Sequence, residues 1–461
     1  MRILLIIYLF SGIFFAQDNL IVIVGDSLKG MAVNGESIRE VIGNVVLTQG
    51  NVKVTCDKAV QYISRNDAEL IGNVIVTQDT LTIKTERGFY FGNLRKTSSN
   101  SGVTLDDKKV ILSAKQGEYF FDEHRAFFKD DVKLYDTIST LTSETLTYYR
   151  NIDKAIAVGL VKIIDPENII YADSLEHFRN KQKTYAFNNV QIKNNSNNII
   201  VLGNRLEDDR YNKYTLIDSM PLMIQIDTSI VKDETGKEQI TFDTLFISSK
   251  KMEVFRSDED KFVAIDSVKI IRGLFSSINE LTIYYQDSAK IVTYKKSEDI
   301  AQPVIWYGYS QLTGDSITIY LLENKITQLD IDGSAFMLTQ NENFPERFDQ
   351  SSSSSSKIYF SNNKVSRVEY FDNVFSIYFM YEENNPNGLI KANSKDAVIY
   401  FNDNEVSDVK LLGNPGTEYY PENLVESNER NFLLPKFNLI ESRPTKEEIY
   451  DKIRRIKWRT H

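Results

Sequence analysis

The sequence predicts an all-β protein, a repeat array of antiparallel strand pairs followed by a short C-terminal helix. Two columns of matched residues recur with the same step of 29 residues through the first part of the chain. Apolar and variable residues alternate within each repeat, as expected for a strand that buries one face. Short polar connections separate the strands, and only nine prolines interrupt the 461 residues. A fixed period of this length indicates stacked copies of one supersecondary unit.

The first column begins in GNVVLTQ (43–49) and GNVIVTQ (72–78). Steps of 29 reach six valines, and an apolar residue follows each valine two positions later. The twelve residues are Val45, Leu47, Val74, Val76, Val103, Leu105, Val132, Leu134, Val161, Ile163, Val190 and Ile192. Most of the residues just before these valines tolerate a positive φ, which predicts a turn or kink there. They are Gly43-Asn44, Gly72-Asn73, Ser101-Gly102, Asp130-Asp131, Gly159-Leu160 and Asn188-Asn189.

The second column is aromatic and keeps the same step. Its members are Tyr62, Phe91, Phe120, Tyr149 and Phe178. Polar turns follow it, such as SRND (64–67) and RNKQ (179–182). A connection of about four residues can only return the chain antiparallel, because parallel pairing needs a crossover of a dozen or more residues. Whether this aromatic column faces the interior or packs outside is open at this stage.

The chain divides by pattern into six segments. Residues 1–16 have the layout of a signal peptide, with Arg2 before an apolar run, which predicts export. An N-terminal segment (17–35) leads to a first repeat region (36–217). An irregular linker or insertion (218–245) precedes a second repeat region with longer repeats (246–435). Within it, the serine-rich stretch 345–357 is interpreted as a flexible surface loop.

The last segment (436–461) predicts a basic amphipathic helix. Thr445 and Glu448 are spaced as a capping box, and Ile449, Ile453 and Ile456 fall on one helical face among basic residues. Such a helix would either cover the last open strand edge or dock onto an acidic partner or anionic membrane surface.

Composition argues against several classes of function. Cys56 is the only cysteine, and the three histidines are far apart, so we expect no disulfide, metal site or cofactor. A net charge of −10 argues against a nucleic-acid partner. The acidic pairs Asp130-Asp131 and Asp208-Asp209 stand at turn-like positions, which does not favour a glycosidase with two catalytic carboxylates. We therefore expect that the protein is not an enzyme.

Four phrases place an acidic residue before an apolar strand that ends in an aromatic residue. They are TCDKAVQY (55–62), YADSLEHF (171–178), LTGDSITIY (312–320) and SKDAVIYF (394–401). Together with the GNV marks, they resemble the OstA-like (organic solvent tolerance) family over roughly residues 36–420, most strongly over 40–195. That family includes the periplasmic bridge proteins of lipopolysaccharide transport and the N-terminal domain of the outer-membrane translocon.

The resemblance implies an elongated, twisted β-jelly roll with an apolar groove that carries lipid A acyl chains. The twelve residues of the first column are then the candidates for lining the groove, and the aromatic column could line it or lie outside. The resemblance also implies a periplasmic location, with association with the outer membrane as a further expectation. Related jelly-roll bridge or translocon proteins would join through unpaired edge strands. The alternative is an exported structural or adhesive β-solenoid, because inward apolar columns can equally fill a core of their own.

Overall fold

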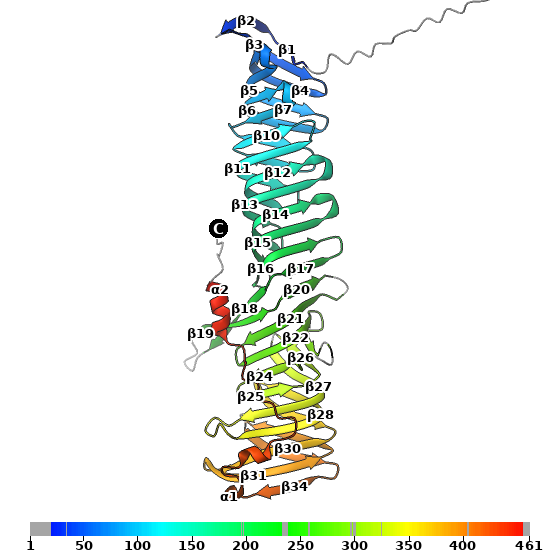
Figure 1. Ribbon diagram of the computed structural model, residues 1–461, viewed down its shortest axis with the longest axis vertical. Coiled ribbons are helices and arrows are strands. Elements are labelled where there is room, and N and C mark those ends of the chain that lie inside the picture. The colour runs from blue at the N-terminus through cyan, green and yellow to red at the C-terminus, as the bar shows by residue number, and fades with distance from the viewer. Residues whose placement is uncertain are drawn as a thin grey trace, which may run out of the picture. The chain divides into compact units, whose positions relative to one another are not determined.

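The computed structural model describes residues 20–33, 35–194, 196, 198–232, 238–256, 259–295, 297, 301–323, 325–402 and 405–454. The chain divides into two compact units between Gln182 and Lys183, called unit 1 and unit 2 below. Figure 1 labels their strands and helices. The expected signal peptide lies outside the described residues. No helix in the described ranges is long and apolar enough to span a membrane.

Unit 1 consists of antiparallel strands joined by tight turns, as the short connections predict. Its strands are β1 (Val22–Val24), β2 (Ser27–Val33), β3 (Glu36–Gln49), β4 (Val52–Tyr62), β5 (Asp67–Gln78), β6 (Leu81–Phe91), β7 (Lys96–Ser99), β8 (Val103–Asp106), β9 (Ile111–Ala114), β10 (Gln116–Phe120), β11 (Arg125–Tyr135), β12 (Thr140–Tyr149), β13 (Lys154–Ile164) and β14 (Asn168–Phe178). Single 3-10 turns η1 (Ile63–Arg65), η2 (Gly92–Leu94), η3 (Arg150–Ile152) and η4 (Arg179–Lys181) follow the aromatic column.

The predicted kinks are β-bulges at which the register shifts. Both residues of the pair Gly72-Asn73 have positive φ, and the pairs at 43–44, 130–131, 159–160 and 188–189 share this conformation. The acidic residue of the family phrase packs against the bulge: Asn73 Nδ2 donates to Asp57 Oδ2 at 2.9 Å. A bulge bends its strand, so each long strand has two halves that lie in different half-sheets.

The bends bring the two edges of unit 1 together. The first edge holds the connections at 49–52, 78–81, 106–111 and 135–140, and the second edge holds those at 62–67, 91–96, 120–125 and 149–154. Side chains of the first edge hydrogen-bond to the second, as between Gln49 and Tyr90. Unit 1 is therefore a folded sheet with a spine of bulges and a seam where its edges meet.

Unit 2 repeats this antiparallel construction with less regular spacing. Its elements are β15 (Lys183–Asn194), β16 (Ile199–Asp209), β17 (Tyr214–Asp218), β18 (Leu222–Lys232), β19 (Glu238–Ser248), β20 (Lys251–Phe255), β21 (Lys261–Arg272), β22 (Phe275–Tyr285), β23 (Lys290–Tyr294), β24 (Val304–Tyr307), β25 (Ser310–Thr313), β26 (Ser316–Leu322), β27 (Lys325–Gln340), β28 (Phe348–Ser361), β29 (Lys364–Phe371), β30 (Val374–Glu382), β31 (Asn385–Ser394), β32 (Asp396–Asn402), β33 (Glu405–Leu412), β34 (Gly416–Tyr420), α1 (Glu422–Val425), η5 (Glu429–Phe432) and α2 (Lys446–Arg454).

Two regions expected to be irregular are strands. The proposed linker 218–245 contains β18 and β19, which pair along their lengths from Leu222↔Ser248 to Lys232↔Glu238. The serine-rich stretch 345–357 is not the predicted surface loop: most of it belongs to β28, which pairs with β27 and β29. Ser351, Ser353 and Ser356 are buried. Their small side chains fit the interior, and the Ser353 hydroxyl donates to the carbonyl of Ser355 at 2.8 Å.

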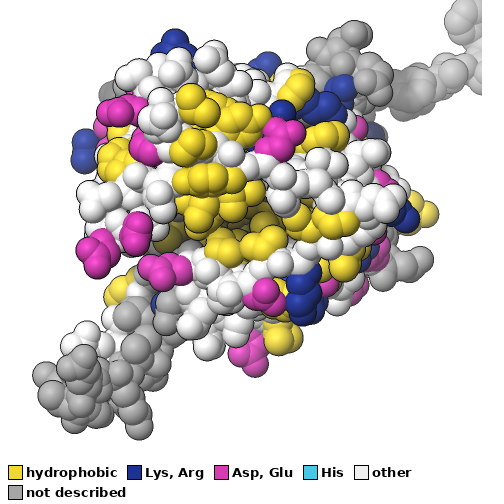
Figure 2. All heavy atoms as spheres, turned by 90° about the horizontal axis from the view of Figure 1, so that it is seen from below, with side chains coloured by type: hydrophobic (Ala, Val, Ile, Leu, Met, Phe, Trp, Pro, Cys, Tyr) yellow, Lys and Arg dark blue, Asp and Glu magenta, His cyan; other side chains and the backbone are white. Residues whose placement is uncertain are grey.

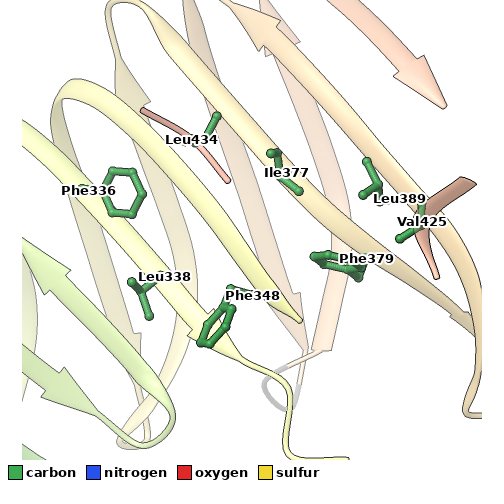
Figure 3. Packing of buried hydrophobic residues seen from close by; sticks show 8 residues of the cluster. All are labelled: Phe336, Leu338, Phe348, Ile377, Phe379, Leu389, Val425 and Leu434. Atoms are coloured by element: carbon green, nitrogen blue, oxygen red, sulfur yellow. The ribbon is translucent and has the colours of Figure 1, made fainter. Parts of the chain in front are cut away.

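The C-terminal tail runs back over the strands of unit 2. Val425 and Leu434 pack with apolar residues of β27, β28, β30 and β31 in one cluster, which is shown in Figure 3: Phe336, Leu338, Phe348, Ile377, Phe379 and Leu389. Arg443 then donates to the carbonyls of Gly308 (2.6 Å) and Leu274 (2.7 Å). The tail is thus anchored by apolar burial and by hydrogen bonds to turn carbonyls.

The predicted helix is α2. The Glu448 N–H donates to Thr445 Oγ1 at 3.4 Å, as the capping spacing predicts. Ile449 and Ile453 pack on a cluster of Leu202, Leu222, Ile224, Phe246 and Ile271. The helix therefore covers a sheet face and not the last open strand edge, and unit 2 itself covers these two isoleucines. Ile456 lies outside the described residues.

Candidate functional site

A continuous apolar row crosses the strands of unit 1. Residues of the predicted first column lie on every second strand of the row. The residues directly opposite them in the strand pairing come from the strands in between. The row runs Leu47, Val54, Val76, Ile83, Leu105, Leu112, Leu134, Leu141 and Ile163, each paired with the next. Their exposed fractions range from 0% to 8%.

The partner residues form a column that the sequence reasoning missed. Val54, Ile83, Leu112, Leu141 and Ile170 also recur with a step of 29. This column could have been found from the sequence by the same 29-residue step. In an antiparallel strand pair, each inward residue of one strand lies opposite an inward residue of its partner. The structure brings the column members from Val45 to Ile163 together in unit 1, all buried. Val190 and Ile192 lie on β15 of unit 2, where Val190 is buried and Ile192 half-buried.

The predicted aromatic column lies on the outer face of unit 1. Its members are half-buried, and cationic side chains cover several of the rings. The Arg65 guanidinium lies 4.3 Å from the Tyr62 ring centroid, and that of Arg125 lies 4.1 Å from the Phe120 centroid. Such cation–π contacts are typical of exposed aromatic surfaces, so these residues do not line the interior.

The inward aromatic residues stand one position earlier. Tyr90, Tyr119 and Tyr148 also have a step of 29 and are buried. Ala68 and Ala126 are their Cα partners on neighbouring strands, so small and large side chains alternate. Period-two alternation forces successive residues to opposite faces. An adjacent pair of aromatic residues therefore marks one inward and one outward ring.

Polar side chains tie the two edges of the seam. The Tyr90 hydroxyl donates to Gln49 Oε1 at 2.7 Å, and Gln49 Nε2 donates to the carbonyl of Gly92 at 3.1 Å. Two repeats later, the Tyr148 hydroxyl donates to Asp107 Oδ2 at 2.7 Å. In both pairs the residues are 41 positions apart. Equivalent side-chain pairs therefore join the two edges at two places in the seam, two repeats apart.

Charged groups add further ties outside these pairs. Lys109 Nζ lies 2.8 Å from Asp153 Oδ1 across the seam. Arg150 Nη2 donates to Thr80 Oγ1 at 2.6 Å. These groups are partly exposed, so each contributes little alone. Together with the buried pairs they hold the edges in contact along unit 1.

The buried phenols stay protonated at neutral pH. Burial raises the pKa of Tyr90 to about 12. Burial also raises the pKa of Tyr148, and the hydrogen bond to the Asp107 carboxylate raises it further. Asp107 additionally accepts the N–H groups of Lys109 (2.9 Å) and Val110 (2.8 Å). At these two pairs, Gln49–Tyr90 and Asp107–Tyr148, the seam therefore joins a protonated phenol donor to an acceptor oxygen.

The interior of unit 2 is more polar. Ser277, Asn279 and Thr282 of β22 are buried. The Thr282 hydroxyl donates to Asn279 Oδ1 at 2.7 Å, and Asn279 Nδ2 donates to Ser277 Oγ at 3.1 Å. Buried polar groups need such partners. The uniformly apolar row is thus a property of unit 1.

The acidic pairs have structural roles. Asp130 and Asp131 form a bulge with positive φ. Asp208 accepts from Arg256 at 2.9 Å, and Asp209 pairs with Lys183 at 2.8 Å. Within the described ranges, no group of three or more His, Cys, Asp or Glu side chains could hold a metal ion.

Three comparisons with known proteins bear on the family resemblance. Residues 17–173 match the model of a family described as OstA-like protein, which confirms the resemblance over the stretch that builds most of unit 1. No curated protein matches the chain. A crystal structure of LptH from Pseudomonas aeruginosa is similar at 15% identity, covering 32% of this chain and 98% of that chain, with a TM-score of 0.18. Its title calls LptH the LptA homologous periplasmic component of the lipopolysaccharide transport device.

Proposed function

From the OstA-like region at residues 17–173, we propose that this protein is exported and shields lipopolysaccharide acyl chains in the apolar interior of unit 1. The observation that carries the proposal is the unbroken row from Leu47 to Ile163. Exposing an acyl chain to water costs about 0.8 kcal/mol per methylene. A multi-chain lipid therefore needs a protein surface that replaces water over its whole path.

The regularity of the row supports movement along it. Val76 and Leu105 present similar aliphatic groups at equivalent positions of successive repeats. A chain that slides between equivalent rungs meets no deep energy minimum. The proposed role requires no chemical step, and the energy for transport comes from partner proteins.

The end of unit 2 supplies a surface for such a partner. Among the described strands, β33 pairs with β32 and β34 pairs with β31, which leaves an edge of each strand open. Val409, Leu412 and Tyr419 on these strands are exposed. Figure 2 shows apolar side chains gathered on the face seen from this end. An open edge and an apolar end together favour a related jelly roll added strand to strand.

The burial of the row favours a second candidate, a structural β-solenoid. Side chains that are 0% to 8% exposed are what a self-filled core would show. Such a protein would act through its outer surface and hold no lipid. The two candidates differ in whether acyl chains ever contact the row.

Site-specific photocrosslinking in cells tests this difference. A photoreactive residue replaces Val74, Leu105, Val132 or Ile163 one at a time. Outward Lys133 and Lys162, which neighbour Val132 on β11 and Ile163 on β13, serve as matched controls. We expect lipopolysaccharide adducts at the four first-column positions and not at the controls. Folded variants that give no adducts at any of these four positions would favour the structural solenoid.

A further inference from the structure

The seam is the part of unit 1 that can open at least cost to the fold. Neighbouring strands are joined by backbone hydrogen bonds over whole ladders, and the spine is continuous chain. The contacts described across the seam instead use side chains, such as Tyr90 with Gln49 and Tyr148 with Asp107. Parting the seam therefore leaves the strand ladders intact.

A bound acyl chain requires this opening. The row residues are almost inaccessible when the edges touch, and interiors packed to this degree have little room for added atoms. The seam lies opposite the spine and extends past several repeats. An entry there would admit a lipid from the side at any rung, with the polar headgroup left at the polar edges.

The middle repeat of the seam is incompletely bonded. Gln78 occupies the position equivalent to Gln49 and Asp107. Its Nε2 donates to Asn51 Oδ1 at 3.3 Å, on the same edge. Its buried Oε1 has no hydrogen-bond partner among the described residues. A buried acceptor without a partner weakens the closed state, so this repeat is where parting would begin.

We propose that the seam of unit 1 is a lateral gate, in which Gln49–Tyr90 and Asp107–Tyr148 are latches that part to admit acyl chains. This inference rests on the proposed function, since it assigns the route by which lipid reaches the row. Gln49–Tyr90 is a pair of uncharged groups, and Asp107 keeps the N–H groups of Lys109 and Val110 when Tyr148 leaves. The polar groups that opening exposes can then be solvated by water. The apolar row is then covered by the incoming lipid.

A cleavable staple across the seam tests the gate in the purified full chain. Cysteines replace Lys109 and Asp153, whose side chains meet across the seam at 2.8 Å. The control places cysteines at Lys96 and Glu118, which meet at the same distance on the neighbouring strands β7 and β10 and do not span the seam. Both pairs are introduced into a Cys56→Ala protein and joined by a disulfide-containing bismaleimide. The Cys56→Ala protein without a staple gives the reference adduct yield. The readout is the adduct between lipopolysaccharide and a photoreactive residue at position 105.

We expect the staple across the seam to lower the adduct yield at least tenfold and reductive cleavage of the linker to restore it. The control staple between β7 and β10 should leave the yield unchanged. Equal adducts with both staples would overturn the gate while leaving the proposed function intact. Absence of adducts even from the unstapled reference would overturn the proposed function, and the gate with it.

Removing one latch supplies an independent arm. Tyr148→Phe deletes the hydroxyl that Asp107 accepts and keeps the inward ring. We expect the initial rate of adduct formation to rise about two- to tenfold, the range that one hydrogen bond can contribute. Tyr149→Phe changes the neighbouring outward ring and should leave the rate unchanged. A folded Tyr148→Phe protein that loads at the reference rate would contradict the latch role.

Discussion

At the scale of single residues, the bulge residues decide where each strand bends. Gly72 has φ +76°, and a Cβ there would clash with the Asp57 carboxylate. Asn73 follows with a positive φ of its own and bonds to the same carboxylate. The GN dipeptide and the acidic residue of the family phrase are therefore one structural device. The conformation is costly for residues other than glycine and asparagine.

Replacing Gly72 should weaken unit 1. We expect Gly72→Ala to lower the free energy of unfolding by about 1–3 kcal/mol, because alanine must adopt a left-handed conformation beside Asp57. Chemical denaturation, with hydrogen exchange of the β5 amides, measures the loss. Gly30→Ala is the matched control, since a Cβ added at Gly30 would have nothing within 4 Å. Equal effects of the two substitutions would contradict the role of the bulge.

Asp349 gives unit 2 a pH-dependent stability. Burial raises the pKa of Asp349 to about 7, although the Phe379 N–H donates to its carboxylate at 2.9 Å. The folded state therefore holds this proton after the unfolded chain has lost it. The contribution of Asp349 to the free energy of unfolding is therefore fully present below about pH 4. It is lost as the pH rises to about 7, by up to about 4 kcal/mol in all.

Asp349→Asn should remove this dependence. The amide retains an oxygen that can accept the Phe379 N–H and carries no charge at any pH. We expect the variant to match the native protein near pH 4 and to exceed its unfolding free energy at pH 8. Urea titrations at the two pH values make the comparison. If the free energy of unfolding changes with pH equally in the native protein and in the variant, Asp349 does not control the pH dependence of stability.

Residue patterns predict contacts within a repeat better than contacts across the seam. The valine column was visible because a 29-residue step keeps its members in register. The pairing of Gln49 with Tyr90 depends on an offset of 41 residues and on two strand bends. Only the folded sheet brings those edges together. The inward tyrosines were missed for a simpler reason, since outward aromatic residues adjoin them.

At the scale of elements, capping and helical spacing predicted α2, while its docking site could not be predicted. The apolar cluster that receives Ile449 comes from β16, β18, β19 and β21, far away in sequence. The serine-rich composition of β28 predicts a loop, because serine has little preference for strands. The segment is nevertheless a strand, since β27 and β29 pair with it on both sides. Tertiary context overrides weak strand propensity in this way.

Truncating Ile449 tests whether the tail is held by its apolar contacts. We expect Ile449→Ala to loosen α2, because large-to-small changes at buried sites cost about 2–5 kcal/mol. Hydrogen exchange of residues 446–454 should become faster, while exchange of β27 and β28 stays unchanged. Glu447→Ala, on the exposed side of the same helix, is the control. Unchanged protection of α2 in the Ile449 variant would place its anchoring elsewhere, in contacts such as those of Arg443.

At the scale of the whole molecule, the repeat produces a structure in which the last described strands, β33 and β34, each keep an unpaired edge. In unit 1 each strand buries its neighbour's apolar residues, so a further rung could always be added. At the C-terminal end of unit 2, β33 has no buried residue among those described. An exposed edge of this kind pairs with another strand unless it is protected. The charges on β33, including Asp408 and Lys410, reduce this tendency without covering Val409 and Leu412.

The open end should therefore drive association through β33 and β34. We expect the purified chain to form larger species as its concentration rises, and Val409→Asp to shift this equilibrium toward the monomer. A charge at the centre of the contact would have to be buried without a partner, which costs more than the apolar contact that it replaces. Sedimentation velocity over a range of concentrations measures the shift. Leu160→Asp alters a residue of similar exposure on the spine of unit 1 and should leave association unchanged. If both variants associate as the native chain does, the contact lies away from β33, and a partner jelly roll would not be expected to join there.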